Sequence, residues 1–328
     1  MKRDDIAVVL HCFDLKWARD LNDTLSEIFY CPLKFPKELP YMAGRSMQLT
    51  YNARLIEKLR SQKITKIIFV NYLEDFSFEF IKVGFVKEIY GICVASSNLS
   101  PGKTQGSKGT DRFMIYQNAL IDMANKIFVP TELLKNSFEQ KKKINVLGLP
   151  IVNTFQEPKT SDKIIFNARL NKEKNPMGIF SLSKENQQRM VVTTPKGSTD
   201  YIGKFKRASE RREIRAFHFN PSEKEYKSIL QSCGFGISFA EEETFGYSLI
   251  DCISNGLMCF APKNAPLTCY NETTIDELMY QNFGDLQEKL EYYRNHSDER
   301  KEIVLKAQNK IRCWQKEQWQ KSLLSHLN

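Results

Sequence analysis

The stretch that decides the fold is FGISFAEEETFGYSLIDCISNGLMCFAPKNAPLTCYN, residues 235–271. A short β-branched and aromatic run, Phe235 to Phe239, ends in an acidic loop, and an apolar-periodic segment from Tyr247 to Asn255 follows. Gly256 ends that segment, and Met258 to Ala261 has the composition of the next buried strand. A strand, a loop, a helix and a strand in this order form a parallel crossover unit, so the stretch predicts an α/β fold.

The loop of this unit has the features of a ligand site. In crossover units, ligands collect at the carboxyl ends of the strands and at the amino ends of the helices. Gly246 lets the backbone approach a ligand closely, and the N–H groups that open the helix favour an anion. Glu243 and Asp251 lie on either side of this glycine, and Asp251 is about two helical turns deep. We therefore predict that both carboxylates face the hydroxyls of one ligand.

The motif resembles the nucleotide-sugar site of retaining GT-B glycosyltransferases, of the group 1, family 4-like type. That family has two glutamates with seven residues between them, and here the second is Asp251, which is one methylene shorter. The family also places an arginine and, five residues later, a lysine after the first strand of its second domain. Arg169 and Lys174 have this spacing here, after the strand predicted at Lys163 to Asn167. A charged turn explains either residue alone, but it explains poorly both together with the later motif.

The resemblance implies two Rossmann-like domains with an interdomain cleft and a C-terminal helix that crosses back. It also implies a retaining, metal-independent transfer of a sugar from a UDP- or GDP-sugar, and no Asp-x-Asp sequence is present to chelate a metal. A departing nucleoside diphosphate develops negative charge, which Arg169 and Lys174 are expected to stabilise. Glu243 is expected to hold the donor sugar and Asp251 the ribose. The expected donor contacts are those of Arg169, Lys174, Glu243, Thr244, Phe245, Gly246 and Asp251.

Length and composition agree with two domains. The 328 residues are 41% hydrophobic, which suffices for two cores. We predict an acceptor domain over 1–150, a donor domain over 151–308 and a C-terminal helix over 309–328, with a Pro/Thr/Asp-rich linker from Leu149 to Asp162. Trp319 and Leu323 share one side of the last helix, as Ile311 and Trp314 do before them. This apolar side is expected to pack on the first domain or on the helix's own domain.

The chain carries no membrane-span or secretory pattern. The mean hydropathy is −0.44, no apolar run reaches the length of a membrane span, and Met1 to Asp5 leads directly into a short strand. The eight cysteines form no CxxC pair and no zinc-ligand spacing. These features predict a cytoplasmic protein with buried, reduced thiols.

Two loops of the first half are candidates for acceptor contact. His11 and Asp14 follow the first predicted strand, Ile6 to Leu10, and no glycine-rich phosphate loop accompanies them. A long polar loop, 95–111, follows the strand predicted at Tyr90 to Val94. His11 can equally be a satisfied polar residue at a strand end, and the long loop can equally be solvated chain. The acceptor contacts expected from the long loop are those of Ser96, Ser97, Lys103 and Lys108.

The charge of the chain suggests an acidic partner. The net charge is +9, and Lys196 to Arg215 carries seven basic residues against three acidic ones. The segment from Glu225 to Asn271 resembles a branch that includes tRNA-queuosine mannosyltransferases and phage DNA-base glycosyltransferases. We therefore predict a nucleic-acid acceptor, such as a 5-hydroxymethylpyrimidine in DNA. The alternatives are a cell-envelope glycan or lipid acceptor, and a non-catalytic module that binds sugar nucleotides or nucleic acid. The sequence does not indicate the sugar, the nucleotide or the oligomeric state.

Overall fold

The computed structural model divides the chain into two compact units. The first comprises Met1–Val152 and Trp314–Asn328, and the second comprises Asn153–Cys313. The residues described are 3–9, 16–32, 45–70, 84–94, 110–195, 199–212, 214, 216–240, 245–263 and 275–327. The domain boundaries predicted from the sequence are at 150 and 308, and the units divide after Val152 and after Cys313.

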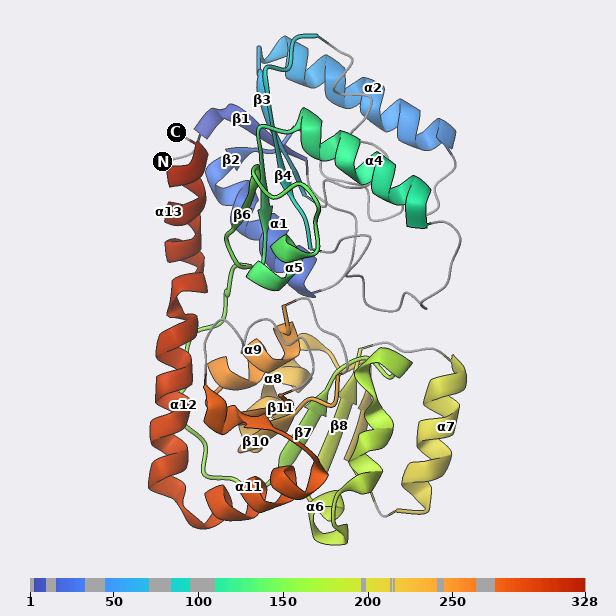
Figure 1. The fold of residues 1–328 in the computed structure, drawn as a ribbon, viewed down its shortest axis with the longest axis vertical. Coiled ribbons are helices and arrows are strands. Elements are labelled where there is room, and N and C mark those ends of the chain that lie inside the picture. Colours follow the sequence, from blue (N-terminus) through green and yellow to red (C-terminus); the bar gives the residue numbers. More distant parts are fainter. Residues whose placement is uncertain are drawn as a thin grey trace. The chain divides into compact units, whose positions relative to one another are not determined.

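The first unit is built on a parallel sheet. Within the described residues the sheet has six strands in the order β2-β1-β3-β4-β5-β6 (Figure 1). The chain leaves β1 toward β2 on one side and reaches β3 on the other, so the order reverses at β1. The strands are β1 Arg3–Val9, β2 Phe29–Tyr30, β3 Lys66–Val70, β4 Glu88–Ile92, β5 Lys126–Val129 and β6 Ile144–Val146.

Helices cover both faces of this sheet because its strands are apolar on both sides. Ala7 and Val9 face a core that also contains Leu55 and Leu59 of α2, Leu120 of α4 and Leu134 of α5. Ile6 and Val8 alternate with them, are equally buried, and face the opposite side. The helices are α1 Lys16–Ile28, α2 Arg45–Ser61, α4 Thr110–Met123, α5 Glu132–Asn136 and α13 Lys316–Leu327.

The C-terminal helix α13 belongs to the first unit. Trp319 and Leu323 are fully buried, and Trp319 Nε1 donates a hydrogen bond to the Gly148 carbonyl oxygen at 3.2 Å. Lys316, the first residue of α13, forms an ion pair with Glu27 of α1. The predicted apolar side is therefore shared between the units, because Trp314, Trp319 and Leu323 lie in the first and Ile311 lies in the second.

A polar cluster at the start of β4 makes the first unit sensitive to acid. A hydrogen bond from the Tyr90 hydroxyl and the Lys66 ammonium, 2.9 Å away, lower the pKa of Glu88. The pair therefore stabilises the fold above the unfolded carboxyl pKa, and the contribution is lost as pH falls through the folded pKa. Because Glu88 and Lys66 are each about a third exposed, we expect Glu88→Gln to cost under about 1 kcal/mol at pH 7 and less at pH 2. Urea unfolding of both proteins at the two pH values measures this, and an equal cost at both would contradict it.

The second unit has the same architecture. Its described residues form a six-stranded parallel sheet in the order β12-β11-β10-β7-β8-β9. The chain runs from β7 through β8 to β9 on one side and from β10 through β11 to β12 on the other. The strands are β7 Ile164–Asn167, β8 Met190–Thr194, β9 Ala216–Phe219, β10 Phe235–Ile237, β11 Met258–Pro262 and β12 Met279–Tyr280.

The helices of the second unit begin where the sequence supplies caps. Ser222 and Glu225 form a capping box at the start of α8, in which each side chain accepts a hydrogen bond from the other residue's backbone N–H. On one side of the sheet, Phe205 of α7 packs between Phe180 and Phe217. The helices are α6 Lys184–Gln188, α7 Thr199–Glu210, α8 Glu223–Ser232, α9 Tyr247–Ser254, α11 Phe283–Asn295 and α12 Ser297–Ile311. Short 3₁₀ segments are η2 Lys172–Lys174, η3 Pro176–Ser181, η4 Asp276–Leu278 and η5 Arg312–Trp314.

The decisive stretch folds as predicted, with β10, α9 and β11 within two residues of their expected bounds. After β11 the next described elements are η4 and then β12, which pairs with β11. A short segment beside an open sheet edge gains more from strand pairing than from local helix propensity. Among the residues that the structure describes, no helix combines the length and the apolar composition of a membrane span.

Candidate functional site

The site is at the point where the strand order of the second sheet reverses. β7 and β10 are parallel neighbours, and the chain leaves them in opposite directions across the sheet. In open α/β sheets this point leaves a crevice outside the carboxyl ends of the two strands, where ligands bind. The turn after β7 carries Arg169 and Lys174, and the turn after β10 leads to Phe245 and Gly246.

One side chain joins these two turns. Asn167, the last residue of β7, donates hydrogen bonds from Nδ2 to the Ser248 carbonyl oxygen at 3.0 Å and to the Tyr226 hydroxyl at 2.8 Å. Arg169 is two residues beyond Asn167, and Gly246 is two residues before Ser248. The structure therefore brings the described parts of the two predicted motifs to one edge of one sheet.

The two cations of the β7 turn have different surroundings. The side chain of Arg169 is 38% exposed, with Nη2 at 3.6 Å from the Glu173 carboxylate. Asn171 Nδ2 also donates to that carboxylate, at 3.0 Å. Lys174 is only 6% exposed. The Arg169 side chain is therefore open to a ligand outside the turn, whereas the Lys174 side chain is buried.

Helix α9 begins at a left-handed glycine. Gly246 is the N-cap residue and has a φ of 79°, a conformation that costs a residue with a Cβ atom about 1 kcal/mol or more. Its carbonyl oxygen accepts bonds from Leu249 and Ile250, the usual first bonds of a helix. Phe245 is buried, and its ring centroid lies 5.9 Å from that of Tyr247. The amino end of α9 therefore presents backbone at the crevice, where a helix favours negative charge.

Asp251 faces the interior of the unit. It is 3% exposed; Oδ1 accepts a hydrogen bond from Asn153 Nδ2 at 2.8 Å, and Oδ2 accepts one from the Tyr226 hydroxyl at 3.1 Å. Burial and, next, the charge of Asp251 raise the pKa of Tyr226 well above its usual value. Asp251 is predicted from the sequence to contact a ribose, and in the structure both of its carboxylate oxygens already accept hydrogen bonds.

Three residues of this arrangement were not identified from the sequence. No site role is predicted for Tyr226, Asn153 falls in the predicted linker, and Asn167 is only the end of a predicted strand. Asn167 had a usable signal, because a polar side chain at the carboxyl end of a central strand points to the crevice. For Tyr226 and Asn153 no local signal exists, since their partner Asp251 is 25 and 98 residues away.

Several predicted site residues lie outside the described residues. These are Glu243 and Thr244 of the donor motif and the acceptor candidates His11, Asp14, Ser96, Ser97, Lys103 and Lys108.

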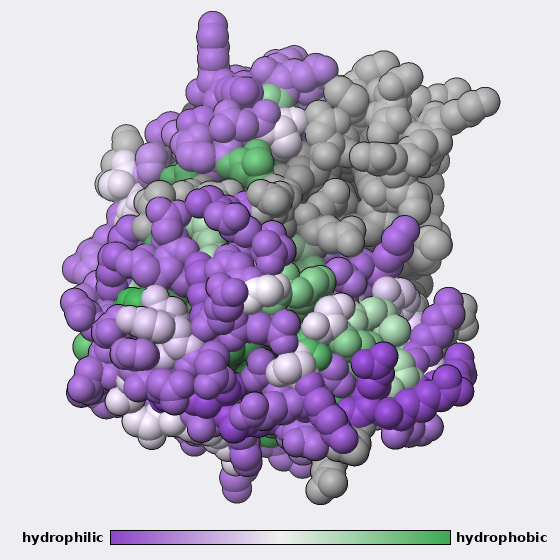
Figure 2. Space-filling model, turned by 60° about the horizontal axis from the view of Figure 1, so that its bottom comes forward, coloured by the Kyte–Doolittle hydropathy of each residue, from purple (hydrophilic) through white to green (hydrophobic). Residues whose placement is uncertain are grey.

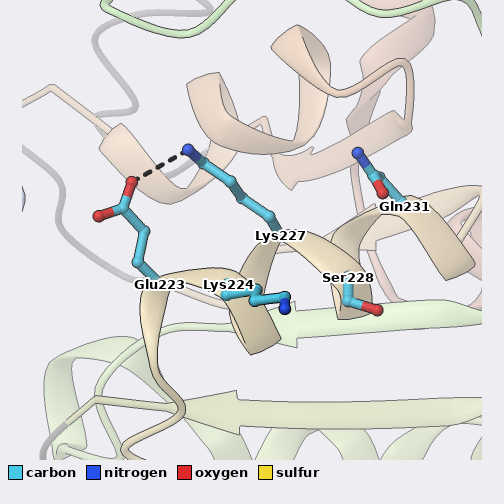
Figure 3. A pocket seen from close by; sticks show the side chains of 5 residues that line it. All are labelled: Glu223, Lys224, Lys227, Ser228 and Gln231. Atoms are coloured by element: carbon cyan, nitrogen blue, oxygen red, sulfur yellow. Dashed lines mark ion pairs between the residues drawn. The ribbon is translucent and has the colours of Figure 1, made fainter.

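Two other polar features of the second unit differ from this site. A depression of about 570 Å³ is lined by exposed residues of α8 alone, and Glu223 and Lys227 in it pair at 3.0 Å (Figure 3). Because a single helix lines this depression, it does not bring together groups from different elements, as the crevice does.

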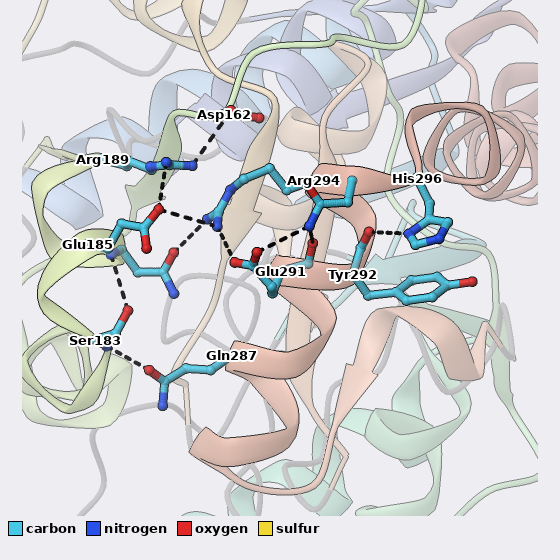
Figure 4. A network of polar contacts seen from close by, with 11 residues as sticks. Asp162, Ser183, Glu185, Arg189, Gln287, Glu291, Tyr292, Arg294 and His296 are labelled. Carbon is cyan, nitrogen blue, oxygen red and sulfur yellow. Dashed lines mark hydrogen bonds and ion pairs between the residues drawn. The ribbon is translucent and has the colours of Figure 1, made fainter.

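The second feature is a network around Arg189 and Arg294 (Figure 4). Arg189 pairs with Glu185 at 2.7 Å, and Arg294 pairs with Glu291 at 2.7 Å. Arg189 directly precedes β8, so the network lies at the amino ends of the strands, opposite the crevice. Arg294 also donates from Nη2 to Asn186 Oδ1 at 2.7 Å, and this bond ties α11 to α6.

The fold is that of solved glycosyltransferases. HepE of Anabaena, solved in complex with UDP and glucose, matches with a TM-score of 0.74 and 11% identity over 98% of each chain. Sucrose-phosphate synthase of Thermosynechococcus elongatus matches with a TM-score of 0.70 and 11% identity over 99% of each chain. TarM of S. aureus matches with a TM-score of 0.65 and 14% identity over 84% of this chain. This chain spans 58% of the length of TarM.

No protein-family model matches the chain, and no curated protein matches its sequence. At these identities the comparisons show the fold, which is the predicted GT-B arrangement of two parallel α/β sheets. The predicted fold class is thereby confirmed.

Proposed function

We propose that this protein is a glycosyltransferase that moves a sugar from a nucleoside-diphosphate sugar to an acceptor hydroxyl. The observation that carries the proposal is the joining of the Arg169 turn to the first turn of α9 through Asn167. A glycosyltransferase with this fold has been solved with UDP-glucose, which supports a nucleotide-sugar donor.

Arg169 is the residue to which we assign the largest share of charge stabilisation. When the bond between the anomeric carbon and the diphosphate breaks, the electron pair goes to the diphosphate oxygen. A guanidinium fork can bind two such oxygens, and Lys174 adds a point charge. The N–H groups near Phe245 and Gly246 add to the same stabilisation. Glu243 and Thr244 would hold the sugar hydroxyls.

The transfer that we propose retains the anomeric configuration and needs no metal. Positioning of the two substrates and stabilisation of the leaving group then account for the rate. The acceptor would approach from the first unit, where His11 and Asp14 follow β1 in the sequence. Strand β1 is the strand at which the order of that sheet reverses.

The acceptor that we propose is a base in nucleic acid, and the surface of α7 supports it. Lys204, Lys206 and Arg207 of α7 are exposed, and within the described residues no ion pair neutralises them. Lys206 Nζ lies 5.7 Å from the centroid of the Phe217 ring. Phe219, on the same side of β9, is 53% exposed. Exposed aromatic rings beside cations form the stacking platforms that bind single strands.

This surface is close to the donor crevice within the second unit. Phe219 pairs with Thr194, and Asn167 pairs with the neighbouring Thr193, so Phe219 lies two strand spacings, about 10 Å, from the end of β7. Hydrophilic side chains dominate the face shown in Figure 2, with smaller apolar patches among them. Arg211 and Arg212 follow the last turn of α7, where a helix favours cations. Lys204 and Lys206 lie in the middle of α7, too far from its carboxyl end for the helix dipole to account for their positive charges.

Reversing the charge of this surface tests the acceptor. The double variant Lys204→Glu, Arg207→Glu is expected to weaken binding of single-stranded DNA about tenfold or more at low salt. The slope of log K against log salt should fall by about 1 to 2. The matched control reverses two exposed lysines on other helices of the same unit, Lys224→Glu and Lys301→Glu, and should leave binding nearly unchanged. Fluorescence anisotropy at several salt concentrations measures both.

Transfer assays separate the acceptor classes. Labelled UDP- and GDP-sugars are offered with 5-hydroxymethylcytosine DNA, tRNA, lipid vesicles and glycans, and we expect label in nucleic acid. TarM was solved with alpha-GlcNAc-glycerol and UDP, which makes a glycan or lipid acceptor the second candidate. Transfer only to these would end the nucleic-acid proposal and leave the donor proposal standing. Donor binding without transfer or hydrolysis would indicate a non-catalytic module.

A further inference from the structure

Asp251 is bound on one side to the segment by which the chain enters the second unit. Asn153, the first residue of that unit, donates to Asp251 Oδ1 at 2.8 Å. The backbone N–H of Gln156 bonds to the Ser254 carbonyl oxygen at 2.8 Å. Lys159 bonds in the same way to Gly256, also at 2.8 Å. The segment 153–159 therefore follows α9, and Asp251 is its contact nearest the amino end of the helix.

Helix α12 also holds the entering segment, near the carboxyl end of α9. Gln308 of α12 donates from Nε2 to the carbonyl oxygens of Gln156 and Ile253, at 2.8 and 2.9 Å. Backbone bonds and a buried glutamine thus hold the segment at several points. The contact at its start depends on side chains alone, those of Asn153 and Asp251.

On its other side Asp251 reaches the end of β7. Tyr226 donates its hydroxyl proton to Asp251 Oδ2 and accepts a bond from Asn167 Nδ2. Asn167 also holds the carbonyl oxygen of Ser248, in the first turn of α9. Since Asp251 accepts at both oxygens, the ionised carboxylate is the form that fits. One buried charge thus orders donors from the linker, from α8 and, through Tyr226, from β7.

We infer that Asp251 is a positioning residue that fixes the donor-binding end of α9 against β7 and the entering segment, and that it does not contact the ribose. This inference rests on the proposed function. Its consequence is that Asn153 and Tyr226, which are distant from the donor motif in sequence, set donor affinity. The shorter side chain of Asp, in place of the Glu of the resembling family, suffices for this role because Asn153 and Tyr226 both bond directly to its carboxylate.

The test exchanges the two members of the Asn153–Asp251 pair. Asn153→Asp places a second carboxylate against Asp251, and we expect it to weaken binding of UDP, or of GDP if the protein prefers it, about tenfold or more. Adding Asp251→Asn restores a donor facing a carboxylate and should return affinity to within about threefold of the original. Isothermal titration measures each variant with the ribonucleotide and with its 2′-deoxy form. A positioning role leaves the ratio of the two affinities unchanged in Asp251→Asn, whereas a ribose contact reduces it.

A second readout needs no nucleotide. Hydrogen exchange of the α9 amides should speed up in the first turn in Asn153→Ala and in Tyr226→Phe. Ser254→Ala removes a different buried side-chain bond of the same helix and should leave the first turn unchanged. Three results would each overturn this inference without touching the proposed function. These are unchanged hydrogen exchange in Asn153→Ala and Tyr226→Phe, a double variant that does not recover affinity, and a reduced ratio of ribonucleotide to 2′-deoxy affinity in Asp251→Asn. A wild-type protein that binds neither UDP nor GDP would overturn the proposed function and this inference with it.

Discussion

Arg169→Ala is expected to lower the rate of sugar transfer by about 10² to 10³, with a smaller loss of donor affinity. The exposed guanidinium lies in the turn that Asn167 ties to the amino end of α9, so it can reach a diphosphate held there. Charge that develops in the transition state makes such a cation worth about 3 to 4 kcal/mol. Single-turnover release of nucleoside diphosphate, with and without acceptor, measures the loss.

The same turn provides the matched control. Lys172 lies between Arg169 and Lys174, is exposed and carries the same charge, and Lys172→Ala should change the rate less than about twofold. Arg169→Lys should recover only part of the activity, because an ammonium cannot form the two parallel bonds of a guanidinium. If Arg169→Ala and Lys172→Ala behave alike, Arg169 does not stabilise the leaving group.

Trp319→Ala should destabilise the first unit by about 3 to 5 kcal/mol, the cost of deleting a buried tryptophan. The ring is fully buried, and its Nε1 satisfies the Gly148 carbonyl oxygen. A larger residue at Gly148 would clash with a second tryptophan of this unit, because a Cβ atom there would lie 2.3 Å from Trp314 Cδ1. We expect a transition of the first unit to move to lower urea while that of the second unit stays.

A conservative variant of Trp319 and a control variant on the same helix complete this test. Trp319→Phe keeps most of the buried surface and loses the hydrogen bond, so it should cost about 1 to 3 kcal/mol. Lys321→Ala changes an exposed residue of the same helix and should stay within about 0.5 kcal/mol of wild type. Because two units need not unfold together, far-UV circular dichroism is fitted with two transitions. An unmoved first-unit transition in Trp319→Ala would show that α13 does not support that unit.

Much of the fold could be predicted from interactions between residues that are close in the sequence. The helix Tyr247–Ser254 and the strand Met258–Pro262 occur where the sequence predicts them, because apolar periodicity and the glycine that ends the helix depend on neighbouring residues. No element is predicted between residues 15 and 46, where α1 and β2 lie. The spacing of Trp17, Leu21 and Leu25 is nevertheless that of one helix face.

The sequence by itself determined that a cation turn and a glycine turn follow two strands of one parallel sheet. It could do so because Arg169, Lys174 and Gly246 are recognised by residue type and short spacing. Only the tertiary structure decided that β7 and β10 are neighbours at the reversal of strand order. It also decided that Asp251 is enclosed by Asn153 and Tyr226. The physical reason is that a buried carboxylate takes its donors from whatever the fold packs around it, and those donors have no fixed distance along the chain.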